Sequence, residues 1–571
     1  MAVTNGWGQG VINNTNGWGK LATNSIDAGS VYQDSASGDT ALIGTSAAFS
    51  YSASSYTQAD SDPTPTITGT AGGTFSGTSG LVFVSTSTGE IDLSASTIAA
   101  HVVTYTVGGV SSNFNLSVTA APFASTKSMA FDGVDDYIDC GNISALNGVT
   151  EATWMGWFKR SVPSGVHYIF GTWGTGSTTK QFTVLQMAST ITVYMANSVG
   201  TQKTMNQITY SFSVDTWYHL AFVYNEAEAS NADKMKVYVN GALQTNTKSG
   251  YALTTLNSST ASFEIGKLGG YTANKFNGKI DEVAVFTSAL SPTNISAIYN
   301  SGVPADLSSY SPTAWYRMGE NGSWKSTQWL LPTNSNKDKV SNYSFEFDGV
   351  DDYIGIPTID LGTSQTISFW VYRNDSNNQG IAIGDVNSGW VGIRVYMNRD
   401  VLYFRVGTSI INFGSILGST QDVWTHICIT RNLGSTSVYL NGVFNNTQTI
   451  TDSTGGVEVD SIGGTTAYSA FVDGKIDEVS FWDSELTSAN VTTIYNSGEP
   501  TTLPSGAVAH YKMGEDATFS TNWTVPDSVG SADGTSANMT IDDRVGEAPN
   551  STSNSVSYNM VEADRETDVP S

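Results

Sequence analysis

The sequence predicts an all-β protein built from several β-sandwich domains. Its composition favours pleated sheets and turns over helices, with Gly 57, Tyr 26 and Trp 14 among 571 residues and only 13% charged side chains. The segment FDGVDDYI occurs twice, at 131–138 and 347–354, and each copy closes an alternating segment. A repeat period of about 200 residues is long enough for a whole domain and too long for a solenoid unit.

Residues 1–35 are predicted to form an N-terminal docking arm. Trp7 and Trp18 lie in two short units, NGWGQG and NGWGKL, separated by an Asn/Thr spacer. The segment has too little apolar surface for a core of its own. One interpretation is a flexible leader. We favour an arm whose tryptophans bury against a partner, because exposed aromatic side chains in a polar segment are typical binding anchors.

Residues 36–121 are expected to form a small β-sandwich, because short alternating runs are separated there by Gly, Ser, Pro and Thr clusters. The segment GTFSGTSGLVFVSTSTGEIDLSAS, followed by VTYTVGG, resembles bacterial immunoglobulin-like and cadherin-like spacer modules. Within it, GEIDL partly matches the E-x-D-x-x-E strand of β-glucanases. Ala95 stands at the third carboxylate position, so Glu90 and Asp92 are predicted to lie on a solvated turn and strand edge.

Two larger domains are predicted at 127–325 and 343–520. Behind each FDGVDDYI the same landmarks follow in order: an aromatic strand, a W-x-H strand, a hairpin reading VYVNG or VYLNG, and GKIDEV before IYNSG. The Asn-Gly pair favours a tight type I′ turn. The repeated pieces AWYRMGE and AHYKMGE come next and predict an extra strand in each domain. Residues 521–571 are polar and are predicted to form a C-terminal tail.

Together these motifs resemble the laminin G-like, concanavalin A-like jelly-roll family. The resemblance covers about 127–305 and 343–503, which is over half of the chain. It implies two antiparallel sheets packed face to face, with the first and last strands adjacent. The alternation in IDEVAVF and IDEVSFW agrees with this fold, because each strand then has one face for the core.

The resemblance also implies a calcium site in each repeat. Asp132 lies on the first strand and Asp281 on the last, so pairing of these strands would bring together two carboxylates, and Ca²⁺ prefers hard oxygen ligands. Asp348 and Asp477 are the equivalents in the second repeat. Alternates in the adjoining turns are Asp135, Asp136, Asp351 and Asp352. The competing interpretation is that these acids cap turns by bonding backbone N–H groups.

Jelly-roll lectins hold sugars on aromatic platforms at a sheet face or rim, so the resemblance implies glycan binding. Trp173 and Trp390, both in Gly-containing loops, are the candidate platforms, and packing beneath loops is the alternative for each. No enzyme is predicted, because the sequence contains no G-x-S-x-G elbow, Walker loop or H-E-x-x-H pattern. His219 and His426 lie inside apolar strands and are predicted to be core histidines rather than catalytic bases.

Charge and hydropathy exclude further classes of partner. With 25 basic and 51 acidic residues the net charge is −26, which repels phosphate backbones and anionic membranes. We therefore expect no nucleic acid partner. No apolar run approaches the length that would span a bilayer, so we expect no membrane insertion. The N-terminus lacks a basic start and an apolar run, which predicts no standard secretory signal.

The Trp-Gly leader and the closing NMVEADRETDVPS resemble segments of structural proteins from marine bacterial viruses, including cyanophages. We therefore expect a non-enzymatic virion structural protein, a capsid or tail fibre or decoration on the outer surface of the particle. Its lectin-like domains would serve host-surface or glycan attachment, and its expected partners are other virion proteins and further copies in a homo-oligomer. The alternatives are a bacterial cell-surface or secreted glycan-binding adhesin and a glycan hydrolase. The missing signal argues against the first, and the missing carboxylate pair argues against the second.

Overall fold

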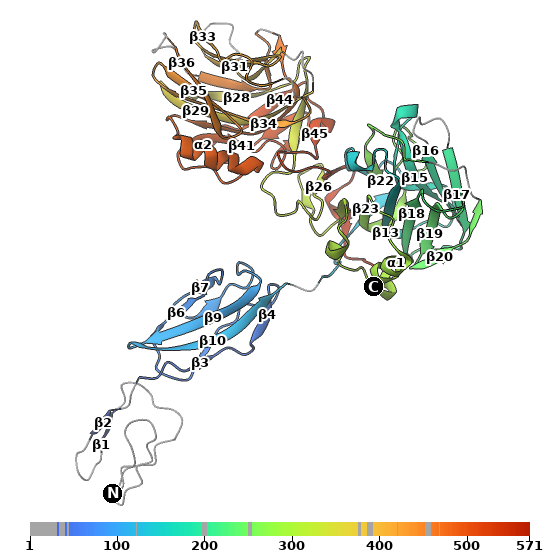
Figure 1. The fold of residues 1–571 in the computed structure, drawn as a ribbon, viewed down its shortest axis with the longest axis horizontal. Helices are drawn as coiled ribbons and strands as arrows, with labels where there is room; N and C mark the ends of the chain where they lie inside the picture. The colour runs from blue at the N-terminus through green and yellow to red at the C-terminus, as the bar shows by residue number, and fades with distance from the viewer. Residues whose placement is uncertain are drawn as a thin grey trace, which may run out of the picture. The chain divides into compact units, whose positions relative to one another are not determined.

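A computed structural model describes the strands β1 (Val31–Gln33) and β2 (Thr40–Leu42) and residues 45–120, 123–196, 203–248, 254–374, 379–384, 392–418, 421–450, 458–467 and 469–571. The chain divides into two compact units, Met1–Ala124 and Ser125–Ser571. Strands dominate both units (Figure 1), and the predicted all-β fold class is confirmed. Within the described residues, no helix is long and apolar enough to cross a membrane.

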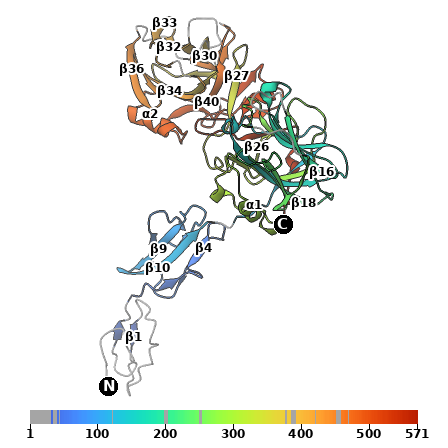
Figure 2. The same cartoon turned by 45° about the vertical axis from the view of Figure 1, so that its right-hand side comes forward.

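The first unit contains a small β-sandwich, as its alternating runs predict. Its long hairpin turns at Gly108 and Gly109, which both have the positive φ of a two-residue type I′ turn. Phe75 and Tyr105 are buried in its core. Figure 2 shows β4, β10 and β9 side by side. The strands are β3 (Phe49–Ser50), β4 (Ser55–Thr57), β5 (Thr66–Ile67), β6 (Thr74–Gly77), β7 (Phe83–Ser85), β8 (Glu90–Ile91), β9 (Ala99–Val107) and β10 (Val110–Thr119).

The first jelly roll lies in the second unit and has two antiparallel sheets. Its first sheet has the order β20-β19-β18-β13-β23-β11-β47, with β24 also paired to β23. These strands are β11 (Ser128–Asp132), β13 (Glu151–Arg160), β18 (Trp217–Asn225), β19 (Met235–Val239), β20 (Ala242–Gln244), β23 (Asn277–Phe286), β24 (Ala314–Tyr316) and β47 (Arg565–Glu566). Its second sheet has the order β21 (Asn246–Lys248), β17 (Lys203–Thr209), β16 (Thr190–Ala196), β15 (Lys180–Gln186), β14 (His167–Trp173), β22 (Phe263–Ile265), β12 (Tyr137–Asp139), β46 (Ser555–Tyr558), β26 (Trp329–Leu331) and β25 (Ser323–Trp324).

The second jelly roll repeats this arrangement. Its first sheet runs β36 (Val443–Thr449), β35 (Ser435–Leu440), β34 (Trp424–Asn432), β29 (Ser364–Arg373), β40 (Asp473–Trp482), β27 (Ser344–Asp348) and β45 (Arg544–Val545), with β41 (Ala507–Tyr511) on β40. Its second sheet runs β33 (Ser409–Asn412), β32 (Val401–Val406), β31 (Ile393–Asn398), β30 (Gln379–Gly384), β37 (Glu458–Ile462), β28 (Tyr353–Asp360), β44 (Gly534–Ala537), β43 (Trp523–Val525) and β42 (Thr518–Phe519). A small hairpin pairs β38 (Gly464–Thr465) with β39 (Ala470–Phe471).

Each jelly roll keeps one apolar core between its two sheets. Phe131 from the first sheet and Ile138 from the second meet in the first core, and Phe347 and Ile354 meet in the second. These four side chains come from the repeated FDGVDDYI segments, whose period-two alternation places them on the inner faces. Burial of such alternating apolar side chains is the main favourable term in forming each sandwich.

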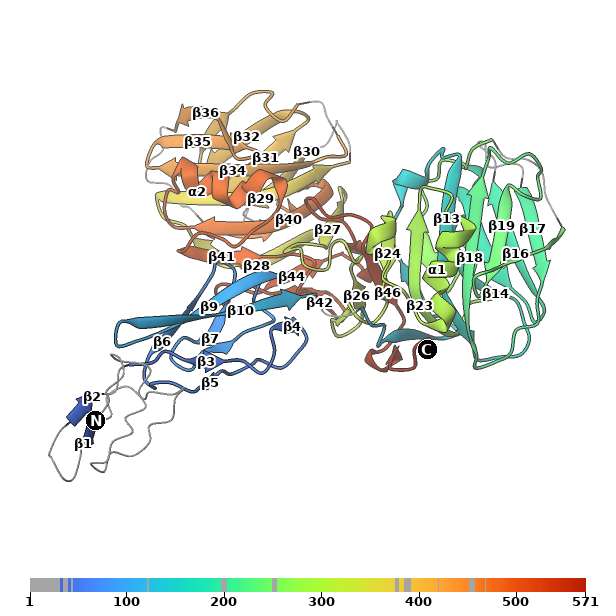
Figure 3. The same cartoon turned by 60° about the horizontal axis from the view of Figure 1, so that its bottom comes forward.

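The predicted type I′ turns are present in both repeats. Asn240 and Gly241 have positive φ in the first, and Asn441 and Gly442 have it in the second. Each turn packs against the tyrosine that ends a short helix, α1 (Pro292–Tyr299) or α2 (Ser488–Tyr495). Figure 3 shows each helix lying over the outer face of a first sheet. Tyr299, for example, stacks on Trp157 of β13 at 5.8 Å between ring centroids.

The second jelly roll is inserted into a loop of the first. In the second jelly roll, residues 526–533 connect β43 to its neighbour β44. In the first, β26 pairs with β46, and residues 332–554, which include the entire second jelly roll, connect them. β46 and β47 then complete the two sheets of the first jelly roll by pairing with β12 and β11. The first jelly roll is therefore discontinuous in sequence.

The C-terminal residues differ from the tail that we predicted for 521–571. They contain an internal repeat, NMTIDDRVGEAPN at 538–550 and NMVEADRETDVPS at 559–571. The first copy supplies β45 to the second jelly roll, and the other supplies β47 to the first. Both copies place an arginine over the tryptophan ring of their own jelly roll, at 4.4 Å for Arg544 and 5.6 Å for Arg565. These polar residues are ordered because the sheets supply backbone hydrogen-bond partners for them.

Candidate functional site

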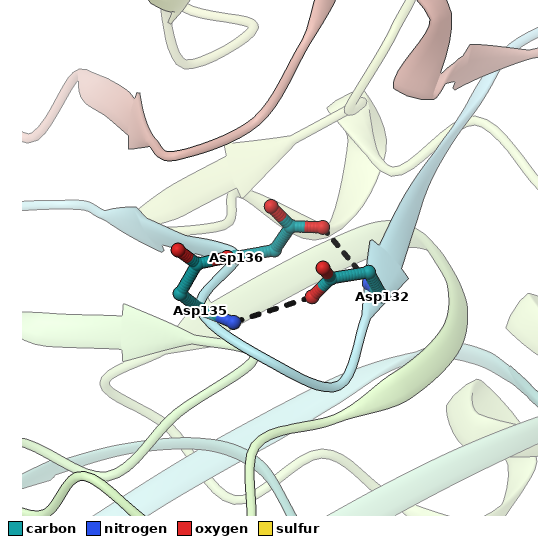
Figure 4. A group of neighbouring side chains, drawn as sticks. All are labelled: Asp132, Asp135 and Asp136. Atoms are coloured by element: carbon teal, nitrogen blue, oxygen red, sulfur yellow. Dashed lines mark hydrogen bonds between the residues drawn. The ribbon is translucent and has the colours of Figure 1, made fainter.

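An acidic turn follows β11, where Figure 4 shows Asp132, Asp135 and Asp136 close together. The Asp132 carboxylate accepts hydrogen bonds from the backbone N–H groups of Val134 at 2.7 Å and Asp135 at 3.2 Å. The Asp136 carboxylate accepts one from the N–H of Asp132 at 2.8 Å. One oxygen from each acid lies within 4.8 Å of the others. The three acids therefore cap their own turn and also present hard oxygen donors.

The second repeat builds the same turn from Asp348, Asp351 and Asp352. Asp348 accepts the N–H groups of Val350 at 2.8 Å and Asp351 at 3.3 Å, and Asp352 accepts the N–H of Asp348 at 3.0 Å. The last acid of each turn is 4% exposed. Burial raises the pKa of Asp136 to about 7 and that of Asp352 to about 6. The two turns are equivalent in geometry and electrostatics.

The structure does not bring Asp132 and Asp281 together. In the register of β11 with β23, Asp132 faces Asn277, whereas Ile280, next to Asp281, faces Met129. Antiparallel pairing places the end of one strand beside the start of the other, so the two carboxylates are separated along the strands. The predicted calcium site shared by this pair does not fit the residues.

The second repeat gives the same result, because Asp348 faces Asp473 and not Asp477. The calcium prediction for Asp132 and Asp348 rests on the acidic turns alone. Asp281 and Asp477 belong to other groups of side chains.

Asp281 lies in a group that we name carboxylate cluster 1, with the buried Glu282 and the half-buried Glu320. One oxygen from each lies within 4.8 Å of the others. Ser125 donates its hydroxyl to Asp281 at 2.6 Å. Burial raises the pKa of Asp281 well above its usual range and raises that of Glu282 to about 7, although Arg317, whose Nε lies 3.3 Å from Glu282, opposes the second shift.

Asp477, Glu478 and Glu515 form carboxylate cluster 2 at the equivalent place in the second repeat. Ser341 donates its hydroxyl to Asp477 at 2.6 Å, as Ser125 does in cluster 1. Burial raises the pKa of Asp477 well above its usual range and that of Glu515 to about 8. The charges of Glu515 and Glu478 add to the shift of Asp477.

A β-bulge positions two acids of each cluster. The register of β13 with β23 shifts between Met155 and Trp157, at the level of Asp281 and Glu282, and the same shift occurs in β29 with β40. Glu282 and Glu478 both have positive φ, at 49° and 50°. A bulge re-aims side chains at the point where a strand carries an extra residue. The bulge is thus a repeated feature of GKIDEV.

The third acid of each cluster ends the repeated pieces AWYRMGE and AHYKMGE. Glu320 accepts the backbone N–H groups of Thr126 and of Lys127, the latter at 2.7 Å, and Glu515 accepts those of Asn342 and Tyr343. The extra strands predicted from these pieces, β24 and β41, are present. Sequence analysis did not assign a role to the two glutamates, although their repetition was a usable signal.

His219 and His426 lie in the interior, as the sequence predicts. Burial lowers the pKa of each imidazole from 6.5 to about 3, so both are neutral at physiological pH. His219 packs on Trp157 with 5.1 Å between ring centroids, and His426 packs on Trp370 at 5.0 Å. These contacts give the histidines a packing role.

Of the two predicted aromatic platforms, only Trp173 lies among the described residues, and its side chain is not presented to solvent. Trp173 is 4% exposed and packs in a small cluster with Ala196 and Leu268. This burial contradicts the use of its ring face as a sugar platform, because neighbouring side chains occupy it. Trp390, Trp7 and Trp18 lie outside the described residues, so their predicted roles stay predictions.

The structure reveals a groove that sequence analysis missed, on the face of the second sheet opposite the second core. We name it the tyrosine–arginine groove. Tyr396 on β31 faces Tyr403 on β32, with 5.5 Å between ring centroids. Two residues along the same strands, Arg394 faces Arg405. The groove encloses about 490 Å³. Its lining residues are Ile381, Arg394, Tyr396, Tyr403, Arg405, Ile410, Ser469 and Ala470.

The first jelly roll carries different side chains at the same register positions. Thr183 stands where the second jelly roll has Arg394, and Thr192 stands where it has Tyr403. Both threonines are 1% exposed. The alternation of Arg and Tyr with apolar residues in IRVYM and LYFRV was the sequence signal for an outward polar and aromatic face.

Glu90 and Asp92 lie in the first unit, as predicted, at a strand end and a turn. Asp92 is half-buried, and its carboxylate accepts hydrogen bonds from the Ser94 hydroxyl at 2.7 Å and the Ala95 N–H at 3.0 Å. These bonds, led by that from Ser94, lower the pKa of Asp92. Its geometry is that of a turn cap.

Comparison with known proteins identifies both jelly rolls. Residues 132–296 and 347–492, more than half of the chain, match the Laminin_G_3 family model, described as the concanavalin A-like lectin/glucanases superfamily. No curated protein sequence matches the chain.

Solved structures with a similar fold include a SAP-like pentraxin from Limulus polyphemus, with 17% identity over 31% of this chain and 84% of that chain and a TM-score of 0.25. The mouse laminin α1 chain domains LG4-5 show 12% identity over 68% of this chain and 95% of that chain, with a TM-score of 0.24. The CBM40 of the Ruminococcus gnavus IT-sialidase, bound to α2,3-sialyllactose, shows 15% identity over 30% of this chain and 96% of that chain, with a TM-score of 0.24.

Proposed function

Because the chain belongs to the concanavalin A-like lectin/glucanases superfamily, we propose that it is a non-enzymatic glycan-binding protein. The observation that carries this proposal is the tyrosine–arginine groove of the second jelly roll, which encloses about 490 Å³. Ligand sites combine concave apolar and aromatic surface with a few polar groups that fix orientation. The groove has that composition.

The two kinds of side chain have separate tasks in this proposal. The rings of Tyr396 and Tyr403, inclined at 42° to one another, supply apolar ring faces against which a sugar packs, and their hydroxyl groups can hydrogen-bond to it. The guanidinium group of Arg405 is suited to match a carboxylate or sulfate in a forked geometry, whereas Arg394 is only 4% exposed and belongs to the buried part of the lining. We therefore propose that glycans with acidic substituents are preferred over neutral ones.

Binding is favoured over hydrolysis by the same lining. Glycoside hydrolysis uses a pair of carboxyl groups that flank the scissile bond. The lining residues that the structure describes include two arginines and two tyrosines but no Asp or Glu. The groove can therefore hold a sugar, whereas the described side chains supply neither the acid nor the nucleophile.

The test is binding of the whole chain to an array with matched neutral, sialylated, uronic and sulfated glycans. Tyr403→Thr and Arg405→Tyr place in the groove the residues that the first jelly roll carries, Thr192 and Tyr194. We expect each to weaken binding about tenfold or more, because a ring contact or a charge-assisted hydrogen bond is lost. Thermal unfolding of both variants should stay close to that of the parent.

Phe444→Ala is the matched control, because Phe444 is an exposed aromatic residue, at 54%, on the first sheet of the same jelly roll. Binding should survive this change. An array without any bound glycan would contradict the proposed function. Binding that the two groove variants leave unchanged would move the site elsewhere on the chain.

Virion attachment stays a prediction of the sequence. Of the docking arm at 1–35, the structure describes only Val31–Gln33, and Trp7 and Trp18 lie outside the described residues. We propose, from the sequence alone, that this arm anchors an oligomer on the outer surface of a particle. Deletion of 1–35 should leave a folded protein that no longer co-purifies with particles, and normal incorporation would rule the arm out.

A further inference from the structure

A serine, a histidine and a glutamate of the second jelly roll are joined by hydrogen bonds. Nδ1 of His510 on β41 lies 2.9 Å from the Ser528 hydroxyl, and Nε2 lies 2.7 Å from the Glu478 carboxylate on β40. His510 is 6% exposed and Glu478 is 5% exposed, whereas Ser528 is exposed. A hydroxyl beside a base that a third group orients is the arrangement that activates a serine as a nucleophile.

The glutamate determines which ring nitrogen of His510 can act as a base. An ionised carboxylate only accepts hydrogen bonds, so the neutral imidazole holds its proton on Nε2, toward Glu478. Nδ1 then carries a lone pair that faces the Ser528 hydroxyl. The hydroxyl also lies 3.0 Å from the His510 carbonyl oxygen, and it can rotate between these two acceptors. Rotation toward Nδ1 gives the state in which the histidine can take up the serine proton.

A tight turn holds Ser528 beside the histidine. The turn belongs to the loop 526–533, where the Asp527 carboxylate accepts the backbone N–H groups of His510 at 3.0 Å and Val529 at 3.1 Å. The Ser528 N–H donates to the His510 carbonyl oxygen at 2.8 Å. Nucleophile and base are therefore held in position by the backbone before any ligand arrives, which lowers the entropic cost of a reaction between them and a ligand.

The serine and the histidine line a cavity of about 390 Å³. Val340, Leu503 and Val529 give this cavity apolar walls, and Lys512 adds an ammonium group. Apolar walls favour a short acyl chain. The ammonium group attracts the negative charge that develops on a carbonyl oxygen under attack. The cavity therefore suits an ester of a short carboxylic acid.

The first jelly roll carries different side chains at these positions. Trp315 stands where the second has His510, and its Nε1 donates to Glu282 at 2.6 Å. Asn334 stands where the second has Ser528, because its N–H donates to the Trp315 carbonyl oxygen at 2.8 Å in the same way. An indole and a carboxamide supply neither a base nor a nucleophile. The jelly-roll fold therefore does not require the serine and the histidine.

We propose that Ser528 is an activated nucleophile that accepts an acyl group from an ester of a short carboxylic acid. Its Oγ forms a bond to the carbonyl carbon, and the bond between that carbon and the alcohol oxygen of the ester breaks. Nδ1 of His510 takes the serine proton and passes it to the departing alcohol. The products are an acyl-serine and a free alcohol, with no change in oxidation state. Glu478 is a positioning residue that acts through His510.

The acyl group is expected to stay on the serine. The backbone N–H groups of Ser528 and Val529 already donate to His510 and Asp527, so they are not free to stabilise an oxyanion. An ester whose alcohol leaves easily compensates for this in the first attack, whereas the acyl-serine has no such leaving group for the attack by water. The proposal thus concerns one covalent transfer to the chain, without turnover of a glycan, and does not depend on the tyrosine–arginine groove.

The first test uses the unmodified chain and p-nitrophenyl acetate. We expect peptide mapping by mass spectrometry to find an acetyl group on Ser528 ahead of the other serines. The same chain unfolded in urea is the control, and Ser528 should then react no faster than the other serines, because the histidine no longer lies beside it. No acetyl group on Ser528, or equal acetylation in the folded and unfolded chains, would overturn the proposal.

Variants then assign the roles of the serine and the histidine. Ser528→Ala should remove the acetylated site, and Ser505→Ala, which changes an exposed serine of the same cavity, should leave it. His510→Ala should slow acetylation of Ser528 by about a hundredfold or more, and added imidazole should restore part of the rate. Because His510 is buried, thermal unfolding should accompany this measurement, and the folded and unfolded parent chains still decide the result if the variant does not fold. An unchanged rate in folded His510→Ala would overturn the proposal.

The role of Glu478 has its own test. Glu478→Gln should slow acetylation of Ser528 about tenfold, because the amide no longer holds the imidazole with its proton on Nε2. Glu478→Asp keeps a carboxylate and should restore part of the rate, which a purely structural role would not predict. Equal losses in the two folded variants would contradict the positioning role.

Discussion

In the first jelly roll, the outer face of the second sheet carries Thr183 and Thr192, both buried. At the same register positions the second jelly roll carries Arg394, which is also buried, and the half-buried Tyr403, and both line the tyrosine–arginine groove. The interiors, by contrast, repeat in detail. The histidine that packs on a tryptophan occurs in both, as do the carboxylate clusters and the bulge. Features required by the fold are therefore repeated, whereas the surface proposed for ligand binding differs.

The two jelly rolls also differ in how the chain closes them. The second is completed by residues that follow it directly, through β43, β44 and β45. The first jelly roll is completed only by β46 and β47, which follow the second jelly roll in sequence. Because the second jelly roll is inserted into the first, two chain segments connect them, one at each end of the second jelly roll, instead of a single linker. This difference predicts unequal responses to truncation.

The largest expected effect comes from deleting residues 559–571. The deletion removes β47, the buried Met560, and Arg565 over the Trp329 ring, all from the first jelly roll. We expect the first jelly roll to lose its cooperative unfolding transition, while the second, whose own β45 remains, keeps its transition. Calorimetry with limited proteolysis would measure both.

Deletion of Ser571 alone is the control for the truncation, because this residue is exposed and lies beyond β47. It should leave both transitions in place. Two intact transitions after removal of 559–571 would show that the C-terminal repeat is dispensable and would contradict the discontinuous domain.

The insertion could not be predicted from the landmarks used for the fold. FDGVDDYI, W-x-H and GKIDEV identify two jelly rolls because burial fixes their alternation, and this part of the prediction is confirmed. The closing strands are polar and short, and they are held by pairing with strands far away in sequence, so local pattern carries little information about them. The repeat of 538–550 in 559–571 was the available signal.

The candidate sites were predictable to a different extent. The acidic turn is local, so its three acids were found together, in Asp132, Asp135 and Asp136. The pairing of Asp132 with Asp281 failed because register along antiparallel strands is not readable from one motif. The bulge at Glu282 could not be predicted from the apparent alternation of IDEVAVF. Ile280 and Val283 are three residues apart and would lie on opposite faces of a regular strand, but the bulge places both in the same core.

The second prediction tests whether the two interiors are equivalent. Burial lowers the pKa of His219 and His426 from 6.5 to about 3. As pH falls below 6.5 the unfolded chain takes up protons that the folded chain refuses, so stability is lost between about pH 6.5 and pH 3. We expect a loss of about 2 kcal/mol per histidine by pH 5.

His219→Gln and His426→Gln should each flatten the pH dependence of the unfolding free energy by that amount, whatever they do at neutral pH. Nε2 of His426 also forms a hydrogen bond with the Ser368 hydroxyl at 2.8 Å. The first jelly roll has Met155 at the position of Ser368 and lacks this hydroxyl. Unequal flattening in the two variants would show that this hydrogen bond separates the two interiors.

The third prediction concerns the Asn-Gly turns. A Cβ on Gly442 would lie 2.7 Å from the Tyr495 ring, and a Cβ on Gly241 would lie 3.0 Å from the Tyr299 ring; both residues have positive φ. We expect Gly241→Ala and Gly442→Ala to cost about 1–2 kcal/mol each from the backbone alone, with the greater loss at Gly442. Denaturant midpoints of the two transitions measure this, and Gly362→Ala, which has positive φ but open space, isolates the backbone term.

The smallest expected effect separates the two closing segments. Burial raises the pKa of Asp568, but hydrogen bonds from Lys159, Lys279 and Trp217 outweigh it and lower the pKa to about 2. The resulting stability is complete above the usual pKa of 3.8 and is lost as pH falls through about 2. Because the Asp568 side chain is 34% exposed, solvent screening limits its contribution to about 1 kcal/mol.

Glu547 occupies the matching position in the second jelly roll and pairs with Lys475 at 2.5 Å, but Tyr372 replaces the second lysine there. Asp568→Asn should therefore lower the unfolding free energy of the first jelly roll at pH 7 more than Glu547→Gln lowers that of the second. Both differences should shrink at high salt, because these pairs lie at the surface. Equal losses would mean that the additional lysine contributes nothing, and that the two closing segments are held by their strands and by the arginines over Trp329 and Trp523 alone.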